Sequence, residues 1–93
     1  ANGSKKNNRR INAVMDRDGE RCFYCGTKMR RPHATGEEAL KLRLATVEHF
    51  LPVAKGGPDN IHNSLCACEP CNREAGAMSI IQKINLRIER WKL

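Results

Sequence analysis

The chain has 93 residues, which is room for one small domain, and domains of this size commonly need a metal, disulfides or a partner to be stable. Only four residues are large aromatics, so bulky core residues are scarce. Seventeen Lys and Arg against ten Asp and Glu give a net charge of +7, which favours nucleic acid as a partner over a protein-only adaptor role. A merely soluble basic surface is the alternative. No run approaches the roughly eighteen apolar residues of a membrane span, so we expect no membrane partner.

The first part of the chain predicts a basic leader and two short helices. Residues 1–8 have no apolar pattern and are expected to form a disordered basic leader, with a single domain over residues 9–93. Ile11, Val14 and Met15 recur at helical spacing before the Asp18-Gly19 turn and predict a short amphipathic helix. A capping-box pattern that begins at Thr35 predicts a second short helix near residues 36–43.

The second half predicts two strands followed by helices. We expect strands near residues 44–50 and 63–67 to form an antiparallel pair, joined by a loop from Pro52 to Asn60 that contains two adjacent glycines. Pro70 suits the first residue of a helix that ends near Gly76. An apolar stripe predicts a last helix over residues 78–91 that is core, or a lid over the core; the stripe is Ile80, Ile81, Ile84, Ile88 and Trp91.

The cysteines predict a structural zinc site. Four of the five form two Cys-x-x-Cys pairs, Cys22, Cys25, Cys68 and Cys71, and 42 residues separate the pairs. Two such turns can place four thiolates around one zinc ion and leave no open position for a substrate, while the ion clamps distant segments together. Two disulfides or free core thiols are the alternatives. The odd count favours a metal in a reducing compartment, so we expect a cytoplasmic or nucleoid-associated protein, with Cys66 as a small buried residue.

An acid and a histidine, Glu48 and His49, interrupt the apolar run of the first predicted strand. Such a pair can simply be the exposed face of an edge strand. Here it is followed by a Gly-Gly loop, by Asn63, and by Asn72 directly after the second Cys-x-x-Cys. This order, with the blocks "CFYCG", "EHFLPVAKGG" and "NSLCACEPCN", resembles the HNH endonucleases over roughly residues 17–76. The resemblance implies an α+β fold, namely a small zinc-stabilised ββα-metal domain with flanking helices.

The chemistry of these residues suits phosphodiester hydrolysis. His49 is the natural general base, because histidine is the side chain best suited to exchange a proton near neutral pH. The Glu48 carboxylate and the Asn72 amide suit Mg²⁺ or Mn²⁺ and leave positions open for phosphate. The resemblance gives Asn63 the role of tying the loop to the backbone and orienting the histidine; an ordinary turn asparagine is the alternative. Because neighbours on an ideal strand point to opposite faces, Glu48 and His49 can serve one phosphate only where the strand end bends.

Basic residues around the site are candidates for contacts with DNA. Lys55 and Arg73 flank it, and a cluster with Lys5, Lys6, Arg9 and Arg10 could grip the DNA backbone unless it is a solvated tail. A basic residue that family members often carry three positions after the final asparagine is Ala75 here, so Arg73 or Arg87 would have to replace it.

The sequence thus predicts a metal-dependent endonuclease that cuts double-stranded DNA, with sequence specificity supplied by a further domain or a homodimer partner. A non-catalytic zinc-stabilised nucleic-acid-binding module and a degenerate, inactive copy of the nuclease are the alternatives.

Overall fold

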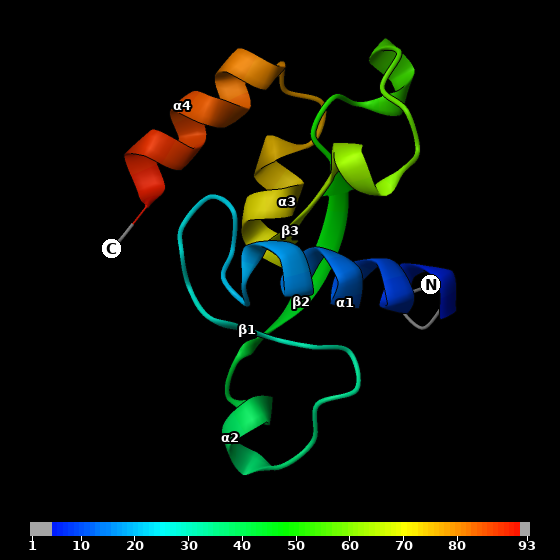
Figure 1. Cartoon of the computed structure of the whole chain (residues 1–93). Helices are drawn as coiled ribbons and strands as arrows, with labels where there is room; N and C mark the ends of the chain where they lie inside the picture. The colour runs from blue at the N-terminus through cyan, green and yellow to red at the C-terminus, as the bar shows by residue number, and fades with distance from the viewer. Residues whose placement is uncertain (1–4, 92–93) are drawn as a thin grey trace.

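The computed structural model describes residues 5–91 and shows a small sheet between helices (Figure 1). The helices and strands follow the order α1 Lys5–Asp18, β1 Met29–Arg30, α2 Glu37–Leu40, β2 Arg43–His49, β3 Ser64–Cys68, α3 Glu69–Ala75 and α4 Ile80–Arg90. Single 3-10 turns, Val53–Lys55 and Ile61–Asn63, lie in the connection between β2 and β3. The predicted α+β fold is confirmed, with β2, β3 and α3 as its ββα unit.

Helix α1 starts earlier than the sequence predicts. It begins at Lys5, so the expectation of a disordered leader is wrong for residues 5–8, while residues 1–4 lie outside the described part of the chain. Ile11, Val14 and Met15 are buried as predicted. Lys6 and Arg10 form ion pairs with Asp59, which attaches the first turns of α1 to the β2–β3 connection. A helix anchored at one end by packing extends readily by further turns.

Strands β2 and β3 form a regular antiparallel ladder. Ala45 pairs with Cys68 at one end and His49 with Ser64 at the other, and the Phe50 N–H continues the ladder to the Asn63 carbonyl oxygen at 2.8 Å. The ladder stays in register through Glu48 and His49, and the chain bends directly after them, at Phe50 and Leu51, so the expected bend lies at the strand end. Strand β1 runs parallel to β2 over two residues, Met29 and Arg30.

The two faces of this ladder meet different helices. Cys66 of β3 lies on the α1 side, since its sulfur is 3.8 Å from the Ile11 carbonyl oxygen. Thr46 of β2 lies on the α3 side, since its hydroxyl accepts a hydrogen bond from Asn72 at 2.8 Å. Side chains alternate along a strand. Glu48 therefore shares the α3 face with Thr46, and His49 belongs to the α1 face.

Helix α4 has the predicted position but buries a different face. Its N-terminus is closed by a capping box between Ser79 and Gln82, and its buried residues are Lys83 and Leu86. Three members of the predicted stripe face solvent: Ile81 and Ile88 are 71% exposed and Ile84 is 42% exposed. The prediction that the isoleucine stripe forms the core is therefore wrong.

Polar anchors on the opposite side fix the orientation of α4. The Lys83 ammonium donates to the His49 carbonyl oxygen at 2.8 Å. The Arg87 guanidinium lies 4.4 Å from the Phe23 ring centroid and 4.3 Å from that of Trp91. These contacts outweigh the apolar stripe in deciding which face docks.

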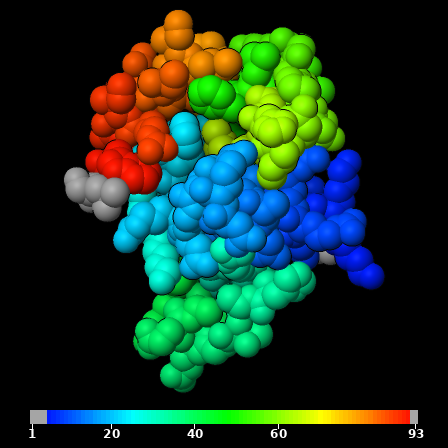
Figure 2. Space-filling model, viewed as in Figure 1, coloured from blue at the N-terminus to red at the C-terminus, as the bar shows by residue number. Residues whose placement is uncertain are grey.

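The segment that carries α2 projects from one end of the molecule (Figure 2). This helix is a single turn, Glu37–Leu40, shorter than the predicted 36–43, and none of its residues is buried. Among residues 5–91, no helix combines the length and the apolar character needed to cross a membrane.

Candidate active site and metal centre

The four paired cysteines form one compact cluster. The sulfur atoms of Cys22, Cys25, Cys68 and Cys71 all lie within 4.8 Å of one another. A tetrahedral zinc ion with Zn–S bonds of about 2.3 Å needs sulfur separations of about 3.8 Å, and the Cys25 and Cys68 sulfurs are 3.9 Å apart. All five cysteines are free, which removes the disulfide alternative. The spacing and the thiolate donor set both fit zinc.

Local turns aim these sulfurs at one point. The first pair sits in a tight turn that Gly26 closes with a φ of 76° and an N–H bond to the Cys22 carbonyl oxygen at 3.0 Å. The second pair straddles the start of α3, where Cys68 is the N-cap and Cys71 lies in the first turn. Cys66 stays outside the cluster, buried as predicted, and its burial raises the pKa of its thiol to about 12.

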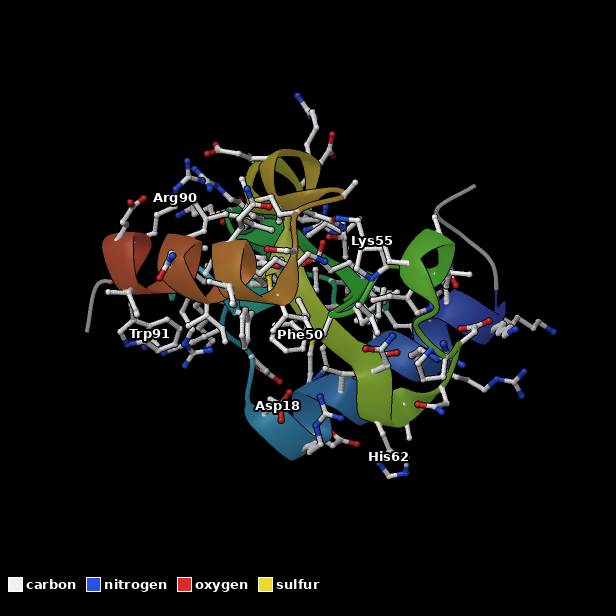
Figure 3. The ribbon with its side chains drawn as sticks, turned by 90° about the horizontal axis from the view of Figure 1, so that it is seen from above. Asp18, Phe50, Lys55, His62, Arg90 and Trp91 are labelled. Atoms are coloured by element: carbon white, nitrogen blue, oxygen red, sulfur yellow. The ribbon has the colours of Figure 1, made fainter. Side chains whose placement is uncertain are left out.

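Two arginines contact the cluster from outside. The Arg43 guanidinium lies 3.3 Å from the Cys68 sulfur, and that of Arg90, which extends from α4 (Figure 3), lies 3.5 Å from the Cys71 sulfur. Burial opposes ionisation of Cys68, but hydrogen bonds from the Cys71 backbone and from Arg43 outweigh it and lower the pKa of this thiol to about 7. Four thiolates around Zn²⁺ would carry a net charge of −2, which Arg43 offsets in part, while the charge of Arg90 is shared with Glu74, its ion-pair partner.

Glu48 is enclosed in the molecule. Its side chain is 8% exposed, one carboxylate oxygen accepts a hydrogen bond from the Tyr24 hydroxyl, and the same oxygen lies 4.0 Å from the Lys83 ammonium. Burial raises the pKa of Glu48, and the bond from Tyr24 and the charge of Lys83 act against that rise. The sequence pattern indicated neither Tyr24 nor Lys83 as a partner of this carboxylate.

His49 has a different carboxylate as its neighbour. Its Nε2 lies 2.9 Å from an Asp59 carboxylate oxygen, which also accepts a hydrogen bond from Arg10. These hydrogen bonds, that of His49 first, hold the pKa of Asp59 well below its usual range. An aspartate after a Gly-Gly-Pro turn is common in loops, so nothing in the sequence singled out Asp59.

Asn63 ties the connecting loop to the end of β2. Its side-chain oxygen accepts from the Leu51 N–H, and its side-chain nitrogen donates to the carbonyl oxygens of Leu51 and Pro58, each at 2.9 Å. The amide thus makes the loop-to-backbone contacts that the family resemblance implies. It also holds the loop that carries Asp59, the partner of His49.

Gly57 is required where this loop passes Leu51. A Cβ at Gly57 would lie 1.8 Å from the Leu51 carbonyl oxygen and 2.9 Å from the Asn63 side-chain nitrogen. We expect Gly57→Ala to lower the free energy of unfolding by at least about 2 kcal/mol, measured by urea denaturation. Gly56→Ala is the matched control. Its φ of 92° makes alanine cost roughly 1–2 kcal/mol there, but no atom lies within 4 Å. An equal or larger loss at Gly56 would contradict the role given to Gly57.

Asn72 reaches the same side of the sheet as Glu48. Its amide nitrogen donates to the Thr46 hydroxyl at 2.8 Å, and Thr46 lies two residues before Glu48 on one face of β2. A carboxylate and an amide oxygen are hard donors, and this set fits Mg²⁺ or Mn²⁺ better than a thiophilic ion. The charge that opposes a cation here is Lys83, close to the Glu48 carboxylate.

The residues predicted to contact DNA differ in how far their side chains are exposed and in the contacts they make within the protein. Arg9 and Arg73 are exposed, and Arg73 forms an ion pair with Glu69 on its own helix. Lys55 is also exposed and donates to the Ala77 carbonyl oxygen at 2.9 Å (Figure 3). Arg10 is largely enclosed by its pairing with Asp59.

Ala75 and Arg87 bear on the basic residue that family members often carry three positions after the final asparagine. Ala75 is fully buried in the core, where a lysine would not fit. Arg87 stacks between Phe23 and Trp91 and donates to the Phe23 carbonyl oxygen at 3.0 Å. Arg87 therefore packs α4 against the zinc turn, and its role as a replacement for the missing contact stays a prediction.

Comparison with known proteins agrees with the geometry. None of the curated proteins compared with the chain matches it. The family model described as HNH endonuclease matches residues 22–77, more than half of the 93 residues, and this range contains the four clustered cysteines together with Glu48, His49, Asn63 and Asn72. The chain therefore belongs to the HNH endonuclease family.

Proposed function

We propose that this chain is a metal-dependent endonuclease that hydrolyses phosphodiester bonds in double-stranded DNA. The observation that carries the proposal is the His49–Asp59 pair, with 2.9 Å between ring nitrogen and carboxylate oxygen, at the end of β2 within the matched region. A nucleic-acid-binding module without catalysis has no need for a histidine held in this way. The proposed structural ion is zinc, because four thiolates fill its coordination positions.

The Asp59 contact decides which nitrogen of His49 acts as the base. An ionised carboxylate can only accept a hydrogen bond, so Nε2 must carry the proton that is shared with Asp59. The lone pair then lies on Nδ1, which can take a proton from a water molecule that attacks the phosphorus. His49 is half-buried, so its ring retains access to solvent and substrate.

Glu48 and Asn72 are the residues that would hold a catalytic Mg²⁺ or Mn²⁺ ion. When bound, such an ion supplies stabilisation of the negative charge on the departing 3′-oxygen. The protein contributes a fixed carboxylate, which the Tyr24 hydroxyl orients, and an amide that Thr46 fixes on the same face. Two protein donors leave coordination positions for phosphate oxygens and water.

Exposed cations should make DNA affinity depend on salt. Each lost phosphate contact lowers the slope of log affinity against log salt by about 0.9. We expect the triple variant Arg9→Gln, Lys55→Gln, Arg73→Gln to reduce the slope by roughly 2–3 units, measured by fluorescence anisotropy with a labelled duplex. Lys41→Gln, on the projecting segment with α2, should leave the slope unchanged. An unchanged slope in the triple variant would remove these residues from the DNA contact surface.

One experiment distinguishes a nuclease from a module that only binds DNA. An end-labelled duplex is incubated with zinc-loaded protein in Mg²⁺, Mn²⁺ or EDTA, and the strands are separated on a denaturing gel. The proposal predicts shorter strands with either divalent ion and full-length strands in EDTA. Full-length strands under all conditions, with a mobility shift on a native gel, would support the non-catalytic binding module instead.

A further inference from the structure

A lysine outside the matched family region reaches the proposed cation site from α4. Lys83 has a fully buried side chain, and its ammonium lies 2.8 Å from the His49 carbonyl oxygen and 4.0 Å from a Glu48 carboxylate oxygen. The family match ends at residue 77. Lys83 thus contacts both members of the Glu48–His49 pair, through the backbone of one and the charge of the other.

Burying an ammonium group is unfavourable unless partners compensate for the lost water. A methionine would fill similar space at this position without that cost. The hydrogen bond to His49 could anchor α4 with any donor, but the approach to Glu48 adds a charge to a site that is expected to attract a cation. This charge is the feature that a purely structural anchor does not explain.

The charges near Glu48 leave no net attraction for a free metal ion. The Glu48 carboxylate contributes −1, Lys83 contributes +1, and Asn72 and Tyr24 are neutral. Burial lowers the pKa of Lys83, and the positive charge of Lys55 acts in the same direction. A divalent ion beside Glu48 would also meet repulsion from the nearby ammonium, which is worth several-fold or more in affinity even at a high effective dielectric constant.

We infer that Lys83 is a resident counter-charge that keeps the catalytic divalent ion weakly bound at Glu48 until a DNA phosphate supplies further negative charge. This inference rests on the proposed function, since it concerns the same cation site. Lys83 acts through its contacts with Glu48 and His49 and is therefore a positioning residue. Its effect is to make metal affinity low enough that loading requires DNA, and by linkage the metal should tighten DNA binding by the factor by which DNA tightens metal binding.

The test measures Mn²⁺ binding to the zinc-loaded protein without DNA, by electron paramagnetic resonance of the free ion. Lys83→Met removes the charge and keeps the bulk, so it should bind Mn²⁺ at least about tenfold more tightly than the parent protein. Lys28→Met is the matched control, because it removes one exposed positive charge from the surface. It should change the affinity by less than about twofold.

A second arm adds a saturating duplex in a His49→Ala background, which prevents cleavage. DNA should raise Mn²⁺ affinity in both proteins, while the Lys83→Met counterpart should load Mn²⁺ without DNA at concentrations at which the protein that retains Lys83 needs DNA. If Lys83→Met does not fold, Lys83→Gln, which keeps an amide donor near the His49 carbonyl oxygen, gives the same comparison. Should neither fold, selective Mn²⁺ broadening of the Lys83 side-chain resonance in the parent, relative to Lys28, is expected only when DNA is added.

The outcomes separate this inference from the proposed function. Mn²⁺ binding that Glu48→Gln abolishes but Lys83→Met does not tighten would leave the nuclease site intact and make Lys83 a structural anchor of α4. Equal broadening of Lys83 with and without DNA would overturn the inference in the same way. Binding that is insensitive to Glu48→Gln would instead remove the cation site itself, and with it this part of the proposed function.

Discussion

Removal of zinc should unfold the domain. A structural zinc site contributes an apparent free energy of roughly 10–16 kcal/mol, as much as the whole net stability of a typical domain, roughly 5–15 kcal/mol. Here the ion would join the turn after α1 to the start of α3, two segments linked by 42 residues. We expect Cys71→Ser, or prolonged chelation, to abolish the cooperative thermal transition followed by circular dichroism. Elemental analysis should give about one zinc per chain.

Cys66 provides the control for a cysteine outside the cluster. It is buried like three of the four ligands, but its sulfur faces the Ile11 carbonyl oxygen of α1. Cys66→Ala should keep one zinc per chain and lose no more than about 2 kcal/mol of unfolding free energy. A zinc-free protein that retains its melting transition would show that the cluster is not the clamp described.

Replacing His49 with alanine should reduce DNA cleavage at least about 100-fold, the loss expected for a general base. The ring is half-buried, and the Lys83 ammonium donates to the backbone carbonyl oxygen of residue 49, which alanine keeps, so the fold and the position of α4 should be retained. DNA affinity should change little because the positive surface is intact. Single-turnover cleavage at saturating protein measures the effect, and cleavage at the parent rate would exclude His49 as the base.

Glu48→Gln should lose DNA cleavage because it weakens metal binding, whereas His49→Ala removes the general base. Glutamine can still accept the Tyr24 hydrogen bond but is a much weaker ligand for a divalent ion. We expect cleavage to be lost at ordinary Mg²⁺ concentrations and to return in part at high Mn²⁺, where mass action compensates for weak binding. The same Mn²⁺ concentrations should not rescue His49→Ala. Equal rescue of both variants would contradict the separate roles given to the base and the metal ligand.

Much of the fold could be predicted because strong local patterns agree with the tertiary structure. The strand near residues 44–50, its antiparallel partner and the proline-initiated helix are present within one or two residues of their expected bounds. The docked face of helix α4 could not be predicted in this way. Its apolar stripe is regular, yet Lys83 and Arg87 determine the docked face through contacts with residues far away in sequence. The spacing of apolar residues along one helix carries no information about such contacts.

The site shows a similar division. The zinc-type cluster followed from spacing alone, because Cys-x-x-Cys turns have few other uses in a chain with an odd cysteine count. The contacts of Asn63 agree with the loop-tying role that the family resemblance implies. The separate environments of Glu48 and His49 did not follow, since they depend on a ladder whose register runs through both residues and on partners from the connecting loop, the zinc turn and α4. Asp59, Tyr24 and Lys83 carry no motif of their own.

The most direct test of the account is the initial rate at which supercoiled plasmid is nicked or linearised. Zinc-loaded parent protein and a His49→Ala preparation, purified side by side, are compared in Mg²⁺, in Mn²⁺ and after addition of EDTA. We predict cleavage by the parent with either divalent ion, none in EDTA, and at least about a 100-fold slower rate for His49→Ala. Intact plasmid with the folded, zinc-loaded parent, or equal rates for the two proteins, would contradict the assignment of the Glu48–His49 pair as a nuclease active site.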